Sequence, residues 1–229
     1  MSKESSIESH NIVIIGAGSA GLSTSYFLTE HNIGHVVLER GLVGNTWDVE
    51  RWDGFHLVNP NWAVRLPGFH YAGTEPDGYL SKKETVDYLR NYANHFDAPV
   101  RPRIEIKKLE RVDDKYLLTA SSGERLLAGC VVVATGAFGV PKIPDYSAVL
   151  SGSISQIHSA EYKNPASLAE GGVLVVGSGQ SGAQITEELH EAGKTVWLSV
   201  GNAGRRPRRY RGRDSSWWNY TMGGFDKTI

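Results

Sequence analysis

Two apolar runs in this chain each lead into a glycine-rich turn and then into an amphipathic segment. The first run, Ile12–Ile15, is followed by glycines at positions 16, 18 and 21, and the second run, Val173–Val176, by glycines at positions 177, 179 and 182. Short continuous apolar runs rich in β-branched residues are typical of parallel strands covered on both faces. After each turn the apolar residues recur at helical spacing. The pattern therefore predicts two strand–turn–helix units.

The hydrophobic pattern also predicts the elements around these two units. They are strands over His35–Leu38, Gly129–Ala134 and Thr195–Val200, helices over Tyr79–Asp97 and Gln180–Ala192, and a small antiparallel meander at about 104–120. Strands that alternate with helices indicate a parallel sheet. Pro141 and Pro144 follow the strand that ends at Ala134, and we take them to mark a change of domain.

The glycine spacing G-x-G-x-x-G is that of a dinucleotide-binding turn. The first glycine allows the tight turn, the second lets a pyrophosphate approach the backbone, and the third lets helix and strand pack closely. The helix N-terminus then offers free N–H groups and a partial positive charge to the phosphates. One such match is a weak signal, whereas two matches in strand–turn–helix context are a strong one. We therefore expect an α/β fold with two Rossmann-like domains that bind two dinucleotides.

The residue at the end of the second strand of each unit indicates which nucleotide is bound. Glu39 would accept hydrogen bonds from ribose hydroxyls and repel a 2′-phosphate, which favours FAD or NAD at the first site. In the second unit we place Ser199 at the corresponding position, and six arginines follow between Arg205 and Arg213. A hydroxyl with nearby arginines suits a 2′-phosphate, so NADPH is favoured over NADH. A solvated loop and a nucleic-acid patch remain alternatives for this basic run.

The segment Gly41–Gly68 has no clean period and carries three of the six tryptophans. Loops this long in a compact domain are usually functional or disordered, and the tryptophans favour an ordered segment. We expect it to lie across a bound flavin. A loop that is packed only by its own aromatic residues is the alternative.

The composition indicates a globular protein and gives no reason to expect nucleic acid or a membrane as partner. The chain has 229 residues, of which 40% are hydrophobic and 21% charged, and its net charge is −1; no apolar run approaches the roughly 20 residues that span a bilayer. Residues 1–10 are polar and lack the apolar core of a signal peptide, so we expect a flexible tail and a cytoplasmic protein. The single cysteine, Cys130, lies in an apolar run and is expected to be a small core residue rather than a nucleophile. The eight histidines are scattered, and no metal site is expected.

Four segments resemble the flavin-dependent class B monooxygenases, the group of flavin-containing, Baeyer–Villiger and N-hydroxylating monooxygenases with their bacterial flavoprotein relatives. They are Gly16–Leu22, Leu38–Trp47, Val131–Pro144 and Val175–Ile185. His158 and Tyr162 match part of that family's hallmark between the two glycine motifs, whereas Gly152 and Ile154 stand where the family has Phe and Gly.

The resemblance implies FAD and NADPH as cofactors and assigns roles to particular residues. Glu39 would hold the FAD ribose, Thr46 and Trp47 would cover the isoalloxazine, and Ile106 would contact the adenine through its backbone. Asn59 would lie where oxygen reacts and is the candidate catalytic residue. The expected cofactor-binding residues are Gly16, Gly18, Ser19, Ala20, Gly21, Glu39, Arg40, Asn45, Thr46, Trp47, Asn59, Ile106, Thr135 and Gly136 for FAD, and Gly177, Gly179, Gln180, Ser181, Gly182, Ser199, Arg205 and Arg206 for NADPH.

The activity that the resemblance implies is hydride transfer from NADPH to FAD, followed by oxygen transfer from O2 through a C4a-peroxyflavin to a small nucleophilic or carbonyl substrate. The expected domains are a tail over 1–10, an FAD-binding domain over 11–148 and an NAD(P)-binding domain over 149–229. Because members of the family return from the second domain to complete the first, the second domain is expected to be inserted and truncated in an N-terminal portion. Self-association or a missing C-terminal segment would then cover the apolar surface that this portion leaves exposed.

Two other functions remain open from the sequence. One is a non-catalytic or truncated nucleotide-binding fragment or partner subunit, and the other is a pyridine-nucleotide:electron-carrier flavoprotein reductase. A flavoprotein disulfide reductase is not expected, because that chemistry needs a redox-active cysteine pair and the sequence holds one cysteine.

Overall fold

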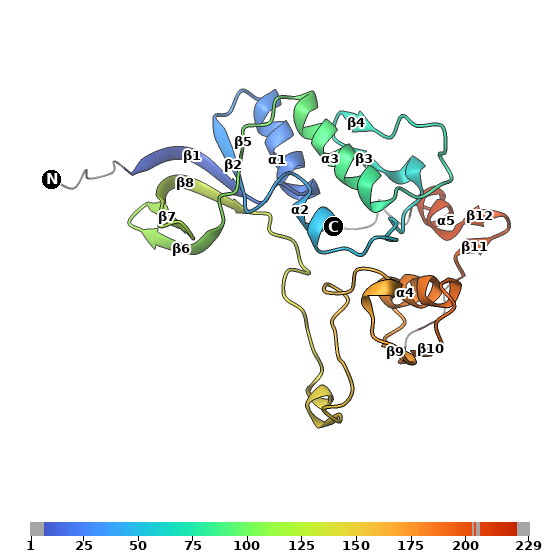
Figure 1. Cartoon of the computed structure of the whole chain (residues 1–229). Coiled ribbons are helices and arrows are strands. Elements are labelled where there is room, and N and C mark those ends of the chain that lie inside the picture. The colour runs from blue at the N-terminus through green and yellow to red at the C-terminus, as the bar shows by residue number, and fades with distance from the viewer. Residues whose placement is uncertain (1–6, 203, 205–206, 224–229) are drawn as a thin grey trace. The chain divides into compact units, whose positions relative to one another are not determined.

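A computed structural model describes residues 7–202, 204 and 207–223 (Figure 1). The contacts divide the chain into two compact units. The first unit comprises the chain up to Glu50 together with Leu66–Phe69 and Lys83–Ile143, and the second comprises Arg51–Arg65, His70–Lys82 and the chain from Pro144 onward. Both units contain parallel strands and helices, which confirms the α/β class predicted from the glycine motifs.

The first unit is built on a six-stranded sheet with the strand order β5-β2-β1-β8-β7-β6. Strands β5, β2, β1 and β8 run parallel, and β6, β7 and β8 form the antiparallel meander. The elements of this unit are β1 (Glu8–Ile15), α1 (Ser19–Glu30), β2 (His35–Glu39), α2 (Asn45–Val49), α3 (Lys82–His95), β5 (Val100–Pro102), β6 (Ile106–Val112), β7 (Lys115–Ala120) and β8 (Arg125–Val133).

Strand β1 is buried on both faces, because neighbouring side chains of a strand point to opposite sides. On one face Ile14 packs with Leu22 of α1 and Tyr92 of α3, and Figure 1 shows these two helices side by side. On the other face Val13 packs with Leu118 of the meander. Packing on both faces fixes the end of β1, and therefore the position of the first glycine turn.

The second unit contains a parallel pair of strands that one helix covers. Helix α4 contacts both β9 and β10, and its Ile185 and Leu189 are buried. On the other side of the pair, Leu174 and Trp197 remain more than half exposed, because no element among the described residues covers them. The elements of this unit are η1 (Asn61–Ala63), η2 (Asp145–Val149), η3 (Pro165–Ser167), β9 (Val173–Val176), α4 (Gln180–Glu191), β10 (Val196–Ser199), β11 (Arg209–Tyr210), β12 (Arg213–Asp214) and α5 (Ser215–Thr221). Strands β3 (Arg65–Leu66) and β4 (Phe69–His70) form a short pair, and each has one residue in either unit.

The tryptophan-rich segment after β2 is ordered, as its composition predicts. It contains α2 and η1, and the Trp52 side chain is only 2% exposed. Trp52 packs edge-to-face on Phe55 with ring centroids 5.2 Å apart. Local aromatic packing therefore contributes to its order. The segment is divided between the two units after Glu50. Residues up to Glu50 belong to the first unit, and Arg51–Arg65 belongs to the second.

The expectation that Cys130 is a core residue is wrong, because Cys130 is exposed on β8. Cys130 pairs with Ile12 in the middle of β1, and β8 lies on the side of β1 away from β2. Helix α1 makes its main strand contacts with β1 and β2. An apolar run does not indicate which of its positions lie beyond the covering helices.

None of the helices among the described residues is long and apolar enough to cross a membrane. Within the same residues, no group of three or more histidine, cysteine, aspartate or glutamate side chains could hold a metal ion.

Candidate functional site

The turn after β1 requires its first and third glycines for reasons internal to the backbone. Gly16 has a φ of +108° and donates its N–H to the Leu38 carbonyl at 2.8 Å. A Cβ at Gly16 would lie 2.5 Å from the Ala134 carbonyl oxygen, and one at Gly21 would lie 1.9 Å from the Gly16 oxygen. Any side chain at these two positions would therefore displace strand or helix.

The second glycine of this turn has a different environment. A Cβ at Gly18 would meet nothing within 4 Å, and its φ of −86° is accessible to any residue. Gly18 is the N-cap of α1, no side chain caps this end, and Ser19 and Ala20 are exposed. The first turn of a helix has N–H groups without intrahelical partners, and these can bind an anion. The space at Gly18 and these donors fit the pyrophosphate of a dinucleotide.

The second glycine turn repeats this geometry except at its first glycine, because a Cβ at Gly177 would meet nothing within 4 Å, unlike one at Gly16. Gly177 has a φ of +103° and donates to the Ser199 carbonyl at 3.0 Å. A Cβ at Gly182 would lie 1.9 Å from the Gly177 oxygen, and one at Gly179 would meet nothing within 4 Å. Gly179 is the uncapped N-cap of α4, which begins at Gln180. The second turn therefore fits a pyrophosphate in the same way.

Glu39 lies at the end of β2 and is buried among backbone N–H groups. One carboxylate oxygen accepts the Ala17 N–H at 2.8 Å, and the other accepts the Gly41 N–H at 2.9 Å. These bonds orient the carboxylate at the first glycine turn. A carboxylate has about four acceptor positions, so Glu39 retains capacity for ribose hydroxyls. The role of Ala17 as its partner was missed by the sequence reasoning, because a residue between two glycines carries no side-chain signal.

The position that corresponds to Glu39 in the second unit is Val200, and the expected correspondence of Glu39 with Ser199 is wrong by one residue. The first glycine of each turn donates to Leu38 in the first unit and to Ser199 in the second. Leu38 and Ser199 are therefore equivalent, and the next residues are Glu39 and Val200. An apolar side chain at this position neither binds ribose hydroxyls nor repels a 2′-phosphate.

Several residues expected around the FAD isoalloxazine and ribose, namely Glu39, Arg40, Asn45, Thr46 and Trp47, belong to the first unit. Arg40 forms an ion pair with Glu50 and lies 3.5 Å from the Thr46 hydroxyl. A Cβ at Gly41 would lie 2.0 Å from the Asn45 amide oxygen, so the chain after Glu39 passes close to α2.

Other expected residues of the first site are placed by the strands that end there. The Cα of Thr135 would be 3.5 Å from a Cβ at Gly16. Ile106 begins β6, two residues after Ile104, whose N–H donates to the Glu39 carbonyl at 2.8 Å. Asn59 is exposed and belongs to the second unit.

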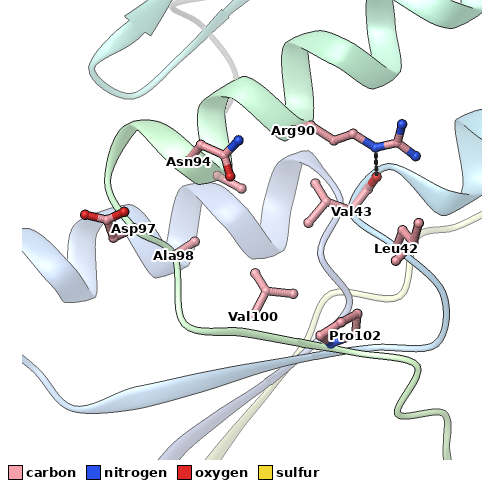
Figure 2. Close-up of a pocket in the computed structure, with 9 residues that line it drawn as sticks. Leu42, Val43, Arg90, Asn94, Asp97, Ala98, Val100 and Pro102 are labelled. Atoms are coloured by element: carbon pink, nitrogen blue, oxygen red, sulfur yellow. Dashed lines mark hydrogen bonds between the residues drawn. The ribbon is translucent and has the colours of Figure 1, made fainter.

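A pocket of about 510 Å³ lies beside the segment that follows β2. Figure 2 shows its mostly apolar floor and the Arg90 side chain at one end. Arg90 donates to the Val43 carbonyl at 3.3 Å and to Asp48 at 2.9 Å, so it ties α3 to the segment around α2. No sequence signal marks this role, because Arg90 is one of several polar residues of an amphipathic helix. The residues that line the pocket are Leu42, Val43, Arg90, Ala93, Asn94, Asp97, Ala98, Val100 and Pro102.

Within the arginine run, Arg208 has a structural role. Arg208 donates to the Tyr79 hydroxyl at 3.2 Å, lies 4.2 Å from the centre of the Tyr79 ring, and pairs with Asp214 at 3.1 Å. Arg205 and Arg206, the two residues expected to bind the 2′-phosphate, lie outside the described residues.

Asp214 is the partly buried acid at the centre of this arrangement. Its carboxylate accepts the Ser216 N–H at 2.7 Å, which caps α5, and the Tyr79 hydroxyl at 2.8 Å. Burial by itself would raise the pKa of Asp214, but the Ser216 and Tyr79 hydrogen bonds and the Arg208 charge outweigh it and lower the pKa below its usual value.

We expect Asp214→Asn to remove an acid-sensitive contribution to stability. The folded-state pKa of Asp214 is depressed, so its contribution is full above the unfolded value of about 3.9 and is lost as the pH falls through the lower folded value. At pH 7 the free energy of unfolding of the variant should be about 1 kcal/mol lower, because Asn still caps α5 but the charge that pairs with Arg208 is lost. The difference should shrink below about pH 4. Melting curves of both proteins from pH 3 to 8 measure this. A difference that stays constant over that range would contradict the assignment.

Comparison with known proteins agrees with this geometry. Residues 13–217 match a family described as pyridine nucleotide-disulphide oxidoreductase. An uncharacterized oxidoreductase, CzcO-like, of Geobacillus kaustophilus is 39% identical over 93% of this chain and 61% of its own length. A probable indole-3-pyruvate monooxygenase, YUCCA10, of Arabidopsis thaliana is 32% identical over 86% of this chain and 52% of its own length.

A solved structure, the flavin-containing monooxygenase from Stenotrophomonas maltophilia, matches with a TM-score of 0.81 and 26% identity over 97% of this chain and 64% of that chain. These similarities confirm the resemblance to flavin monooxygenases that the four sequence segments carry. The chain spans about three-fifths of the length of the first relatives it matches.

Proposed function

Because the chain belongs to the pyridine nucleotide-disulphide oxidoreductase family, we propose that the protein is an FAD-dependent, NADPH-using oxidoreductase of the monooxygenase type. The observation that carries the proposal is the repeated geometry of the two glycine turns, each with an open second glycine at an uncapped helix. Two such turns suit a reaction that needs two dinucleotides at once. The monooxygenase names of YUCCA10 and of the Stenotrophomonas protein support the type of reaction.

The first turn is the proposed FAD site. The N–H groups at the start of α1 bind the pyrophosphate, and Glu39 accepts the ribose hydroxyls with the lone pairs that Ala17 and Gly41 leave free. The backbone at Ile106 contacts the adenine. Arg40, Asn45, Thr46 and Trp47 lie along the flavin, with Thr135 and Gly136 at the end of β8.

The second turn, Gly177–Gly182, is the proposed NADPH site. Bound FAD supplies the chemistry, because it accepts the hydride of NADPH and activates O2 to place one oxygen atom on the substrate. The chain's own contribution is to bind both nucleotides and to exclude water around the reacting atoms. Asn59 is the proposed catalytic residue. A small nucleophilic or carbonyl substrate, self-association and a cytoplasmic location belong to the same proposal.

The test is the visible spectrum of the purified protein, followed by anaerobic addition of NADPH and then of air. Bound flavin that NADPH bleaches, with O2 consumed only when a substrate is present, is the expected result. A protein that binds flavin and passes electrons to a carrier protein without consuming O2 would be the electron-carrier reductase instead. A protein that takes up neither nucleotide when both are supplied would refute the proposal.

We expect removal of Arg205 and Arg206 to weaken NADPH binding more than NADH binding. Each charge-assisted contact to a 2′-phosphate contributes roughly 1.5–3 kcal/mol, so the double change to Ala should lower NADPH affinity at least about 100-fold. Titration of each nucleotide into the protein measures this, with Arg209→Ala as the control, because Arg209 is exposed in β11. An equal loss for both nucleotides would mean that the pair contacts something other than the 2′-phosphate.

A further inference from the structure

Helix α4 holds a loop of the second unit with a glutamine that bonds both backbone groups of one residue. The Gln184 oxygen accepts the His56 N–H at 3.2 Å, and its amide nitrogen donates to the His56 carbonyl at 3.1 Å. Only this orientation of the amide satisfies both bonds, since one group of His56 is a donor and the other an acceptor. Gln184 therefore fixes the backbone direction at His56, one helical turn into α4.

A second contact lies one turn further along the same face of α4. Residues four apart on a helix lie on one side, and Glu188 follows Gln184 at this spacing. A Cβ at Gly54 would lie 2.5 Å from a Glu188 carboxylate oxygen, so the loop backbone passes directly against this side chain. The other Glu188 oxygen accepts the Tyr162 hydroxyl at 2.8 Å. Burial, together with the Glu188 carboxylate, raises the pKa of Tyr162, so the phenol stays protonated and keeps donating.

The start of the loop is also bonded to residues outside α4. Asp53 donates its N–H to the Lys163 carbonyl at 2.8 Å. Its carboxylate accepts Asn164 at 2.8 Å and Lys82 at 2.9 Å, and these hydrogen bonds lower the pKa of Asp53. Hydrogen bonds at residues 53 and 56, and the close approach at Gly54 between them, therefore join the loop to the rest of the second unit.

The loop held in this way leads directly to Asn59. Its apolar side chains, Trp52 and Phe55, are buried, whereas Asn59 is exposed. Leu57 donates its N–H to the Leu80 carbonyl at 2.8 Å and is the last backbone attachment before Asn59. Gln184 therefore holds the backbone three residues before Asn59, and the Asn61 N–H, which donates to the Gly78 carbonyl at 2.9 Å, holds it on the other side.

We propose that Gln184 is a positioning residue, which fixes the Asn59-bearing segment 53–61 to the helix of the second glycine turn. The functional meaning of this attachment rests on the proposed function, because only then does α4 bind NADPH and Asn59 act on the reaction. A nucleotide that orders the start of α4 then also orders segment 53–61, through one side chain one turn away.

The test is hydrogen exchange of the whole chain in four proteins, followed by mass spectrometry of peptides that cover residues 52–61. In Gln184→Ala, exchange in this segment should rise about tenfold, because two hydrogen bonds that hold His56 are lost. In Gln184→Glu, which keeps the acceptor for the His56 N–H, much of the protection should return. Glu187→Ala changes an exposed residue of the same helix and should match the wild type.

A purely structural role of Gln184 would raise exchange throughout 144–223 and lower the melting temperature, and this outcome would overturn the proposal. An unchanged rate in 52–61 would overturn it as well. Saturating NADP⁺ provides the second readout. It should protect both the 173–184 peptide and the 52–61 peptide in the wild type, but only the former in Gln184→Ala, and equal protection of 52–61 in both proteins would speak against the role.

Calorimetry of NADP⁺ binding to the wild type separates this proposal from the proposed function. If NADP⁺ does not bind, the second nucleotide site is refuted, while the ligand-free exchange rates still decide the role of Gln184. If NADP⁺ binds and the exchange of 52–61 is the same in all four proteins, the proposed function stands and the positioning role falls.

Discussion

A Gly18→Val variant is expected to fold like the wild type and to lose its flavin, whereas Gly21→Ala is expected to lose both. A side chain at Gly18 meets no protein atom within 4 Å, and the backbone there is extended, so the fold tolerates it. The branched side chain occupies the space proposed for the pyrophosphate. A clash of this kind costs about 1–3 kcal/mol, which corresponds to about 5–150-fold weaker FAD binding.

The methyl group that Gly21→Ala adds has no such space, because it would lie 1.9 Å from the Gly16 carbonyl oxygen. Helix α1 must move away from β1, and the free energy of unfolding should fall by about 1–3 kcal/mol or more. Melting temperature and bound FAD per chain, measured on both variants, separate the two effects. Flavin content in Gly18→Val equal to that of the wild type would show that the pyrophosphate does not lie at this turn.

Replacing Glu39 by Ala is expected to destabilise the first unit before any nucleotide is considered. The carboxylate pairs with the N–H groups of Ala17 and Gly41, and its removal leaves both donors without a protein partner. A buried polar group without a partner costs about 1–3 kcal/mol, so the loss should be about 2–5 kcal/mol in the free energy of unfolding. Bound FAD should reduce this loss little, because the ribose contact is removed as well.

The matched control for this prediction is Glu30→Ala, which removes an exposed carboxylate at the end of α1. Urea unfolding of the two variants without nucleotide, and again with excess FAD, gives the comparison. A Glu39→Ala protein as stable as Glu30→Ala would mean that water replaces the carboxylate at both N–H groups.

The parts of the fold that the sequence predicted are those specified by nearby residues. The strand Val173–Val176 was predicted to the residue, because the apolar run and its glycines lie next to each other. The helix predicted over Tyr79–Asp97 occupies Lys82–His95, since its period is clear and its ends are not. The glycine turns were found for the same reason, because each is specified within six residues.

The rest could not be predicted because it depends on contacts between distant residues. The grouping of Arg51–Arg65 with the second unit rests on pairs such as Asp53 with Asn164, which lie 111 positions apart and have no shared pattern. The one-residue offset between Ser199 and Val200 depends on strand register, which an apolar run does not specify. For such features the sequence supplied candidates and the contacts decided among them.

The exposed thiol on β8 gives this chain a ready attachment point for a fluorescent dye. Cys130 is the only cysteine in the sequence, so a maleimide dye labels one position without any prior engineering. Its strand partner Ile12 lies four residues before Gly16, which is about 13 Å along an extended strand. A dye whose emission overlaps flavin absorption would therefore be quenched as FAD enters the first turn, and uptake could be followed in real time. The same thiol makes a reducing agent necessary in storage, because two molecules can cross-link through it.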